Sequence, residues 1–268
     1  MTIPFQRTAD TVRGAGAEAA ALANHLIRYP TGIPPERHRR PCPPHPVPQS
    51  APGAGAADLR HHGPVLLLHG FIDNRAVFTP LRRSLHRHGW THLHALNHSP
   101  LTRDVRAAAV LLGRHVEWAR QAHEGPVALV GHSLGGLIAR YYVQRLGGDA
   151  LVDTVITLAT PHEGTTAALL PNPFPITRQL RPGSDLLAEL RLPAPRCRTR
   201  FTALRGELDE LVLPGRHAWL RHPDLTVDNL LVPGTGHVGL PAHPRAVELV
   251  RQALEVRETG FLTERHAC

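Results

Sequence analysis

The chain has 268 residues, of which 42% are apolar and 19% charged, as is typical of a folded globular protein and not of a disordered one. Its formal net charge of +8 comes from arginine alone, and the arginines are scattered rather than gathered in a stripe, which argues against nucleic-acid binding. No apolar run is long enough to span a membrane, and Cys42, Cys197 and Cys268 lack the spacing of metal ligands.

The first sixty residues differ in composition from the rest. The alanine-rich stretch Gly14–Tyr29 predicts a helix that Pro30 ends. Residues 30–63 are rich in proline, glycine, alanine and histidine, which predicts a linker or an extended arm. No signal-peptide core follows the early arginines, so we expect a cytoplasmic location, with secretion as the alternative. We therefore divide the chain into an N-terminal helix and proline-rich extension, 1–60, and a main domain, 61–268.

Beyond residue 60, short apolar runs alternate with helical patterns. The runs that we expect to form strands are Val65–His69, Thr91–Leu96, Val127–Val130, Thr154–Leu158, Phe201–Leu204 and Thr226–Leu231. The patterns that we expect to form helices are Phe78–His88, Asp104–His123, Leu134–Leu146 and Pro244–Val256. Strands too apolar to alternate are buried on both faces. The sequence therefore predicts an α/β fold, with a mostly parallel central sheet and helices on both faces.

One serine lies in an unusual context. Gly131-His-Ser-Leu-Gly135 fits the pattern G-x-S-x-G, between a buried strand and an amphipathic helix. Glycines two residues before and after the serine allow a sharp turn that presents the hydroxyl at the head of the helix. The alternatives are a serine that only caps the helix and a turn that holds phosphate. No phosphate-binding motif is present, and the chain has no lysine to serve one. We interpret Ser133 as a nucleophile.

A serine nucleophile needs a base and an acid that orients the base, which follow it along the chain in this strand–turn–helix context. The histidines downstream of the serine are His162, His217, His222, His237, His243 and His266. His237 is favoured because it lies in a glycine-flanked loop between the last expected strand and the closing helix. His162 is the alternative, although it precedes every candidate acid.

The acid is expected in the stretch Gly206–Pro214, just past a strand. Glu207, Asp209 and Glu210 are the candidates there. Asp209 is favoured because Leu208 beside it can hold this part of the loop inward, while Glu210 faces solvent. The alternative is an ordinary solvated turn.

Two backbone N–H groups are needed to bind the negative oxygen of a tetrahedral intermediate. The N–H of Leu134, directly after Ser133, is one candidate. The second is the N–H of Phe71, since Gly70 lets the loop after the first strand turn inward. Read alone, that His-Gly pair is an ordinary turn. Chemistry of this kind requires no metal and no organic cofactor.

These motifs together resemble the α/β-hydrolases, in particular bacterial triacylglycerol lipases and esterases. The matching segments are VLLLHGF (65–71), VALVGHSLGGLIARYY (127–142), TLATPHEGT (157–165), GELDELVLP (206–214) and GTGHVGL (234–240). The resemblance implies a serine carboxylester hydrolase with Ser133, Asp209 and His237 as nucleophile, acid and base, and with Phe71 and Leu134 as oxyanion donors. The lysine-free composition suits a GC-rich, actinobacterial genome.

Two alternatives to hydrolysis remain open from the sequence. An acyltransferase would use the same three residues, and a non-catalytic binding protein could share the fold. The expected partner is a small-molecule or lipid ester, with transient contact to a lipid interface. The stretch Ala168–Pro195 is either a short lid or acyl-chain wall, or ordinary packing of a surface helix at Ser184–Leu192.

Overall fold

The structure is a computed structural model that describes residues 23, 27, 29–32, 62–71, 73–97, 104–123, 125–171 and 173–265, with side chains up to residue 256. Most of the expected N-terminal helix and proline-rich extension lies outside the described residues, as do Cys42 and Cys268. Cys197 is a free, half-buried thiol.

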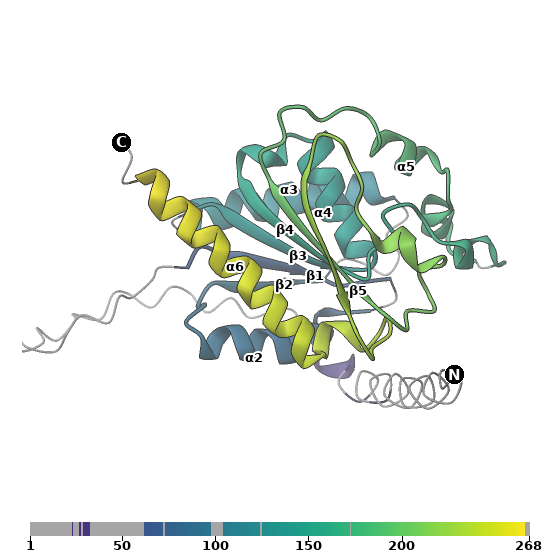
Figure 1. Cartoon of the computed structure of the whole chain (residues 1–268), viewed down its shortest axis with the longest axis horizontal. Coiled ribbons are helices and arrows are strands. Elements are labelled where there is room, and N and C mark those ends of the chain that lie inside the picture. The colour runs from purple at the N-terminus through teal and green to yellow at the C-terminus, as the bar shows by residue number, and fades with distance from the viewer. Residues whose placement is uncertain are drawn as a thin grey trace, which may run out of the picture.

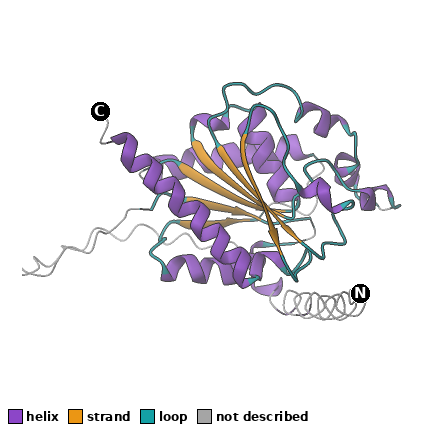
Figure 2. Cartoon of the chain, in the orientation of Figure 1, coloured by secondary structure: helices purple, strands orange, loops and turns teal. Residues whose placement is uncertain are grey.

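Six strands form one sheet in the order β2-β1-β3-β4-β5-β6 (Figures 1 and 2). Their bounds are Val65–Leu68 (β1), Leu93–Leu96 (β2), Val127–His132 (β3), Val152–Leu158 (β4), Arg200–Gly206 (β5) and Thr226–Val232 (β6). All five strand pairings are parallel. The predicted mostly parallel sheet is therefore confirmed.

Helices cover both faces of the sheet, with α6 lying across the near face in Figure 1. The helices are α2 (Thr79–Arg87), α3 (Val105–Ala122), α4 (Leu134–Arg145), α5 (Asp185–Glu189) and α6 (Pro244–Arg265). Leu66 and Leu68 pack against α3 and α4, whereas Val65 and Leu67 pack against α2 and α6. Both faces of β1 are thus buried, which explains why its sequence is apolar throughout.

Short 3-10 helices occupy the loops at the edges of the sheet. They are η1 (Arg75–Phe78), η2 (Gly148–Ala150), η3 (Thr166–Leu169), η4 (Pro175–Leu180), η5 (Gly215–Ala218) and η6 (Leu240–Ala242). None of the six was expected from the sequence, because one or two turns of helix are too short to show a hydrophobic period.

The helix stop expected at Pro30 is wrong. Residues 29–32 are all helical, so the helix does not stop at the proline. A proline removes one N–H donor but has a φ angle that suits a helix. Side-chain amides of the main domain bind carbonyls of this segment: Asn74 Nδ2 donates to the carbonyl of Tyr29 at 2.8 Å, and Asn97 Nδ2 to that of Gly32 at 2.6 Å.

The strand order places a crevice at the carboxyl ends of the strands. From β1 the chain passes to β2 on one side, and then returns to β3 on the other side of β1. Loops that leave the carboxyl ends of β1 and β3 therefore diverge, which is where parallel sheets bind ligands. The loops after β5 and β6 leave from the same edge, because those strands run in the same direction.

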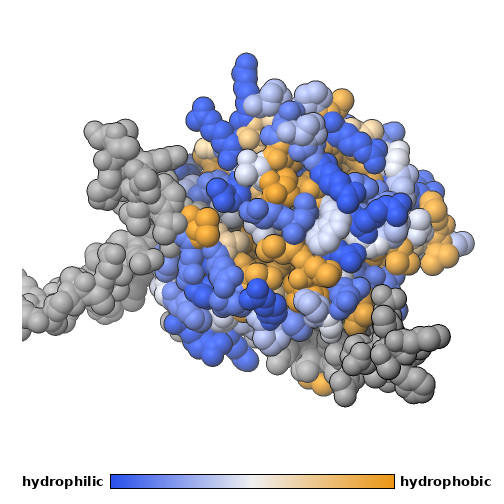
Figure 3. All heavy atoms as spheres, viewed as in Figure 1, coloured by the Kyte–Doolittle hydropathy of each residue, from blue (hydrophilic) through white to orange (hydrophobic). Residues whose placement is uncertain are grey.

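The surface is mixed in character. On the face shown in Figure 3, apolar residues form several separate patches among polar ones. No helix in the described part of the chain has both the length and the apolar character required to cross a bilayer.

Candidate active site

Ser133 lies in a strained turn between β3 and α4. Its φ of 50° and ψ of −116° fall outside the regions that non-glycine residues favour, at a cost of about 1–3 kcal/mol. Two hydrogen bonds hold the turn. The Ser133 N–H donates to the carbonyl of Leu158 at 2.8 Å, and the Thr160 hydroxyl donates to the Ser133 carbonyl at 3.0 Å. The serine side chain therefore projects from the head of α4 at the edge of the sheet.

The flanking glycines are required by close backbone contacts. A Cβ atom on Gly131 would lie 2.5 Å from the backbone nitrogen of Gly136. A Cβ atom on Gly135 would lie 2.3 Å from the carbonyl oxygen of Leu68 in β1. Both distances are shorter than real Cβ contacts, and the atoms met are backbone atoms that cannot move aside. The spacing G-x-S-x-G thus follows from how closely this turn packs against its neighbours.

Asp209 and His237 form a buried pair from two loops that are distant in the sequence. His237 Nδ1 lies 3.1 and 2.9 Å from the two oxygens of the Asp209 carboxylate. Since a carboxylate only accepts, Nδ1 carries the proton and Nε2 of the neutral ring is left as an acceptor. The N–H groups of Leu211 and Val212 each donate to Asp209 Oδ1 at 2.9 Å. The carboxylate is thereby fixed from both sides.

These contacts also set the protonation state of the acid. Burial raises the pKa of Asp209, but the hydrogen bond and charge interaction with His237 and the two backbone donors outweigh burial, and the pKa is lowered overall. Asp209 is therefore ionised at neutral pH and holds the proton on the Nδ1 side of His237.

The lowered pKa predicts how acid affects stability. On acidification the unfolded chain takes up a proton at Asp209 near the ordinary pKa of about 3.9, before the folded chain does. This contribution to stability is full above that pH and is lost as the pH falls through the folded pKa. We expect the free energy of unfolding to fall less steeply between about pH 5 and pH 2.5 in Asp209→Asn than in the unmodified chain. Urea unfolding across this range measures the slope, and equal slopes would contradict the expectation.

The other candidates occupy different places. Glu207 accepts a hydrogen bond from the Gly234 N–H at 3.1 Å, and Glu210 is exposed. His162 is buried, with Nε2 3.0 Å from the hydroxyl of Thr157. Burial and the nearby charge of Arg140 lower its pKa well below the ordinary value. None of these three contributes to the Asp209–His237 pair.

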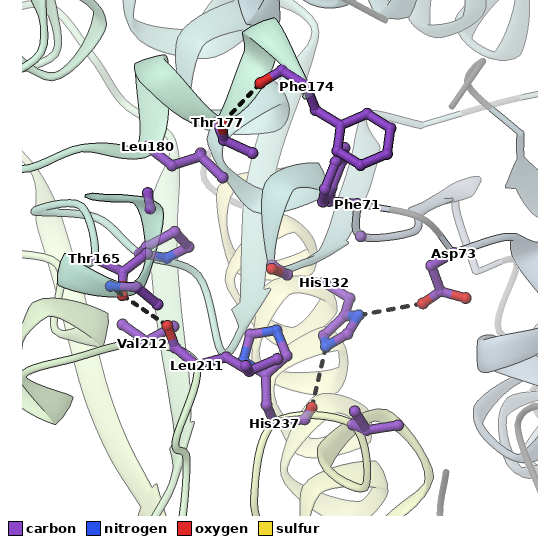
Figure 4. Close-up of a pocket in the computed structure, with 16 residues that line it drawn as sticks. Phe71, Asp73, His132, Thr165, Phe174, Thr177, Leu180, Leu211, Val212 and His237 are labelled. Atoms are coloured by element: carbon purple, nitrogen blue, oxygen red, sulfur yellow. Dashed lines mark hydrogen bonds and ion pairs between the residues drawn. The ribbon is translucent and has the colours of Figure 1, made fainter. Parts of the chain in front are cut away.

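A pocket with a volume of about 450 Å³ joins the parts of the site (Figure 4). Phe71, Ser133 and His237 all line it. The Phe71 ring also packs edge to face on Phe174, with ring centres 5.0 Å apart. Leu134 is buried and begins α4 directly after the serine, so its N–H belongs to the first turn of the helix. The structure thus brings the loops that carry all five predicted residues together at the carboxyl ends of the strands.

Three further residues of the site were not predicted. Thr165 ties the acid loop in place: its hydroxyl donates to the Leu211 carbonyl at 2.7 Å and accepts from the Leu213 N–H at 3.0 Å. Asp73 and His132 form a second Asp–His contact in the pocket wall. In the sequence, His132 lies within the G-x-S-x-G motif and Asp73 lies two residues after Phe71.

The described residues contain no group of three or more histidine, cysteine or acidic side chains that could hold a metal ion.

Comparison with known proteins places residues 64–187 within the model of a family described as palmitoyl protein thioesterase. The mature form of the Bacillus licheniformis lipase BlEst2 is similar in structure, with a TM-score of 0.63 and 18% identity over 73% of this chain and 93% of that one. Aspergillus fumigatus lipase B has the same TM-score and identity, over 72% of this chain and 52% of that one. The carboxylesterase EstE1, from a metagenomic library, has a TM-score of 0.53 and 18% identity over 75% and 80%. At these identities the similarity shows a shared fold.

Proposed function

We propose that this chain, which shares the α/β-hydrolase fold of the lipases and esterases it resembles, hydrolyses carboxylic esters with Ser133, His237 and Asp209 as catalytic triad. The observation that carries the proposal is the Asp209–His237 hydrogen bond, together with the strained Ser133, which lines the same pocket as His237. Because Nδ1 of His237 faces Asp209, Nε2 is left to act as a base. Its target would be Ser133, the only serine that lines the described pocket.

In the first half-reaction, Ser133 Oγ attacks the ester carbonyl while His237 Nε2 takes the hydroxyl proton. The N–H groups of Phe71 and Leu134 bind the oxygen that becomes negative. His237 then gives the proton to the leaving alcohol, and an acyl-enzyme remains on Ser133. Asp209 stabilises the imidazolium throughout by accepting from Nδ1.

In the second half-reaction, water takes the place of the alcohol. His237 removes a proton from the water, which attacks the acyl-enzyme, and the same two N–H groups bind the oxygen again. The proton passes to Ser133 Oγ as the acid leaves. Both half-reactions use the same base and the same N–H donors, so a change that misplaces the base or a donor slows both half-reactions.

The pocket wall suits an acyl chain. Its far side is formed by Ala167, Ala168, Phe174, Thr177 and Leu180, which come from η3, η4 and the loop between them. We assign this segment as the acyl-chain wall, while α5 beyond it packs into the core through Leu186 and Leu187. Leu169, Leu170 and Leu211 are exposed around the wall and would contact a lipid surface.

Chain-length preference tests this assignment. Ala167 is half-buried and lines the pocket, so Ala167→Phe places a ring where the acyl chain would run. Each methylene that is excluded costs about 0.8 kcal/mol, so two cost about tenfold in kcat/KM. We expect p-nitrophenyl dodecanoate to lose about tenfold or more in kcat/KM, while p-nitrophenyl acetate stays within about twofold.

The neighbouring residue provides a matched control. Thr166 is exposed and outside the pocket lining, so Thr166→Phe adds the same ring on the same 3-10 helix without entering the pocket. Equal losses in the two variants, or equal losses for both esters, would contradict the assignment of the wall.

The family-model match favours a second substrate class. Because the match is to palmitoyl protein thioesterases, an acyl thioester is a candidate substrate for the same triad. The acyl-enzyme would be identical and only the leaving group would change, from an alcohol to a thiol. Rates with an oxygen ester and a thioester of the same acyl chain separate the two possibilities.

A fluorophosphonate probe tests the proposed function directly. The probe forms a covalent bond with an activated serine, so we expect one adduct, located by peptide mass on Ser133. An unlabelled protein without ester turnover would contradict the proposal. Turnover with added alcohols, analysed for ester products, distinguishes hydrolysis from acyl transfer.

A further inference from the structure

A second Asp–His contact lies beside the proposed base (Figure 4). His132 is buried at the end of β3, one residue before Ser133. Its Nε2 is 3.2 Å from the backbone carbonyl oxygen of His237. Its Nδ1 is 3.6 Å from Oδ2 of Asp73, in the loop after β1, which is an ion-pair distance rather than a hydrogen bond. One imidazole thus connects two loops of the site.

The groups that face the two ring nitrogens of His132 are both acceptors. On one side a carbonyl oxygen can only accept, so Nε2 is suited to donate to it. On the other side Nδ1 faces the carboxylate of Asp73. The His237 ring, with its centre 5.0 Å away, and the backbone of Gly70 also face the ring of His132. Both members of the pair are well shielded, with exposed side-chain fractions of 5% for His132 and 10% for Asp73.

The two loops that His132 connects carry different parts of the proposed chemistry. The loop that contains Asp73 also contains Phe71, whose N–H is the proposed oxyanion donor. The other loop carries His237. Asp209 fixes the Nδ1 side of the base, but the direction of the ring towards Ser133 also depends on the backbone of His237. The contact from His132 to that backbone is therefore suited to set the distance between base and nucleophile.

We propose that His132 is a positioning residue, held by Asp73, that fixes the base loop and the oxyanion loop relative to Ser133. The inference rests on the proposed function, since it assumes that His237 is the base and the Phe71 N–H an oxyanion donor. His132 does not touch the reacting atoms. It acts through the backbone of His237 and the carboxylate of Asp73.

Three single variants and one double variant test the proposal with p-nitrophenyl butyrate. His132→Leu removes both contacts, and His132→Gln keeps an N–H donor close to the place of Nε2. Asp73→Asn removes the charge that holds the ring. Misplacement of catalytic groups by about 1 Å costs on the order of 100-fold. We expect His132→Leu to lower kcat by about 10- to 100-fold with KM within about threefold, since both half-reactions use the same base.

Rescue and coupling distinguish positioning from packing. We expect His132→Gln to keep kcat at least about fivefold above that of His132→Leu, although glutamine fills the space of the ring no better than leucine. The double variant Asp73→Asn/His132→Leu is expected to be no slower than His132→Leu alone, because Asp73 acts through His132. Thermal unfolding identifies any variant that fails to fold, and His132→Gln and Asp73→Asn then carry the test between them.

A histidine far from the site serves as control. His123 caps the end of α3 just before β3, at the amino ends of the strands and away from the pocket. We expect His123→Leu to leave kcat within about twofold. Unchanged kcat in all His132 and Asp73 variants of an active enzyme would overturn the proposal. Equal losses in His132→Gln and His132→Leu, or additive losses in the double variant, would also overturn it. Absence of ester turnover and of probe labelling in the unmodified chain would overturn the proposed function, and this inference with it.

Discussion

Replacing Ser133 with alanine is expected to abolish ester turnover while the fold persists. The variant lacks the attacking oxygen, and no other serine lines the described pocket. Loss of a serine nucleophile lowers kcat by roughly 10⁴- to 10⁶-fold in enzymes with such triads. The measurement is kcat/KM with p-nitrophenyl butyrate, together with labelling by the fluorophosphonate probe.

The fold of this variant should be unaffected. Alanine keeps the Cβ atom, so the turn with φ of 50° is neither relieved nor further strained, and the backbone hydrogen bonds of residue 133 remain. Circular dichroism and the thermal unfolding midpoint check this point. Turnover close to that of the unmodified chain would rule out Ser133 as the nucleophile.

Replacing Asp209 with asparagine is expected to lower kcat by about 10³- to 10⁴-fold. The asparagine oxygen can keep the hydrogen bonds from Leu211 and Val212, which leaves its NH₂ group facing His237 Nδ1. Two donors cannot face each other, so the imidazole shifts its proton to Nε2 and can no longer accept one from serine. The measurement is kcat for p-nitrophenyl butyrate at neutral pH.

A matched control lies one residue away. Glu210 is exposed in the same loop, so Glu210→Gln removes one negative charge without changing the partners of His237. We expect its kcat to stay within about twofold of the unmodified chain. A large loss of kcat in Glu210→Gln with a small loss in Asp209→Asn would show that Asp209 is not the acid.

The overall architecture could be predicted from the sequence because its signals are local. Apolar runs such as Val65–Leu68 are buried on both faces only within a covered parallel sheet, and the structure has that sheet. The turn at Ser133 was equally readable, since the clashes that exclude side chains at Gly131 and Gly135 involve neighbours fixed by the same motif and by β1. Chain order then limited which later loops could supply an acid and a base.

Other features could not be predicted because they depend on contacts between loops far apart in the sequence. Asp73 and His132 are polar residues beside motifs, and nothing in their spacing indicates that they meet. The role of Thr165 in holding the acid loop depends on residues 46 and 48 positions away. The helix through Pro30 also departs from the local rule, and the carbonyls of Tyr29 and Gly32 accept hydrogen bonds from Asn74 and Asn97 of the main domain.

The position of β6 has a consequence for how activity is gained and lost. Among the described strands β6 pairs with β5 alone, most of its side chains are exposed or half-exposed, and His237 follows it in the chain. Strands with few buried contacts open first when a protein unfolds locally. Opening of this edge strand would withdraw His237, the proposed base, from Ser133 while the strands around the serine stay paired. During synthesis, likewise, the nucleophile turn can form before the ribosome has released the strand that brings its base. The proposed activity would therefore appear only once β6 has joined the sheet, and not as soon as the core has formed.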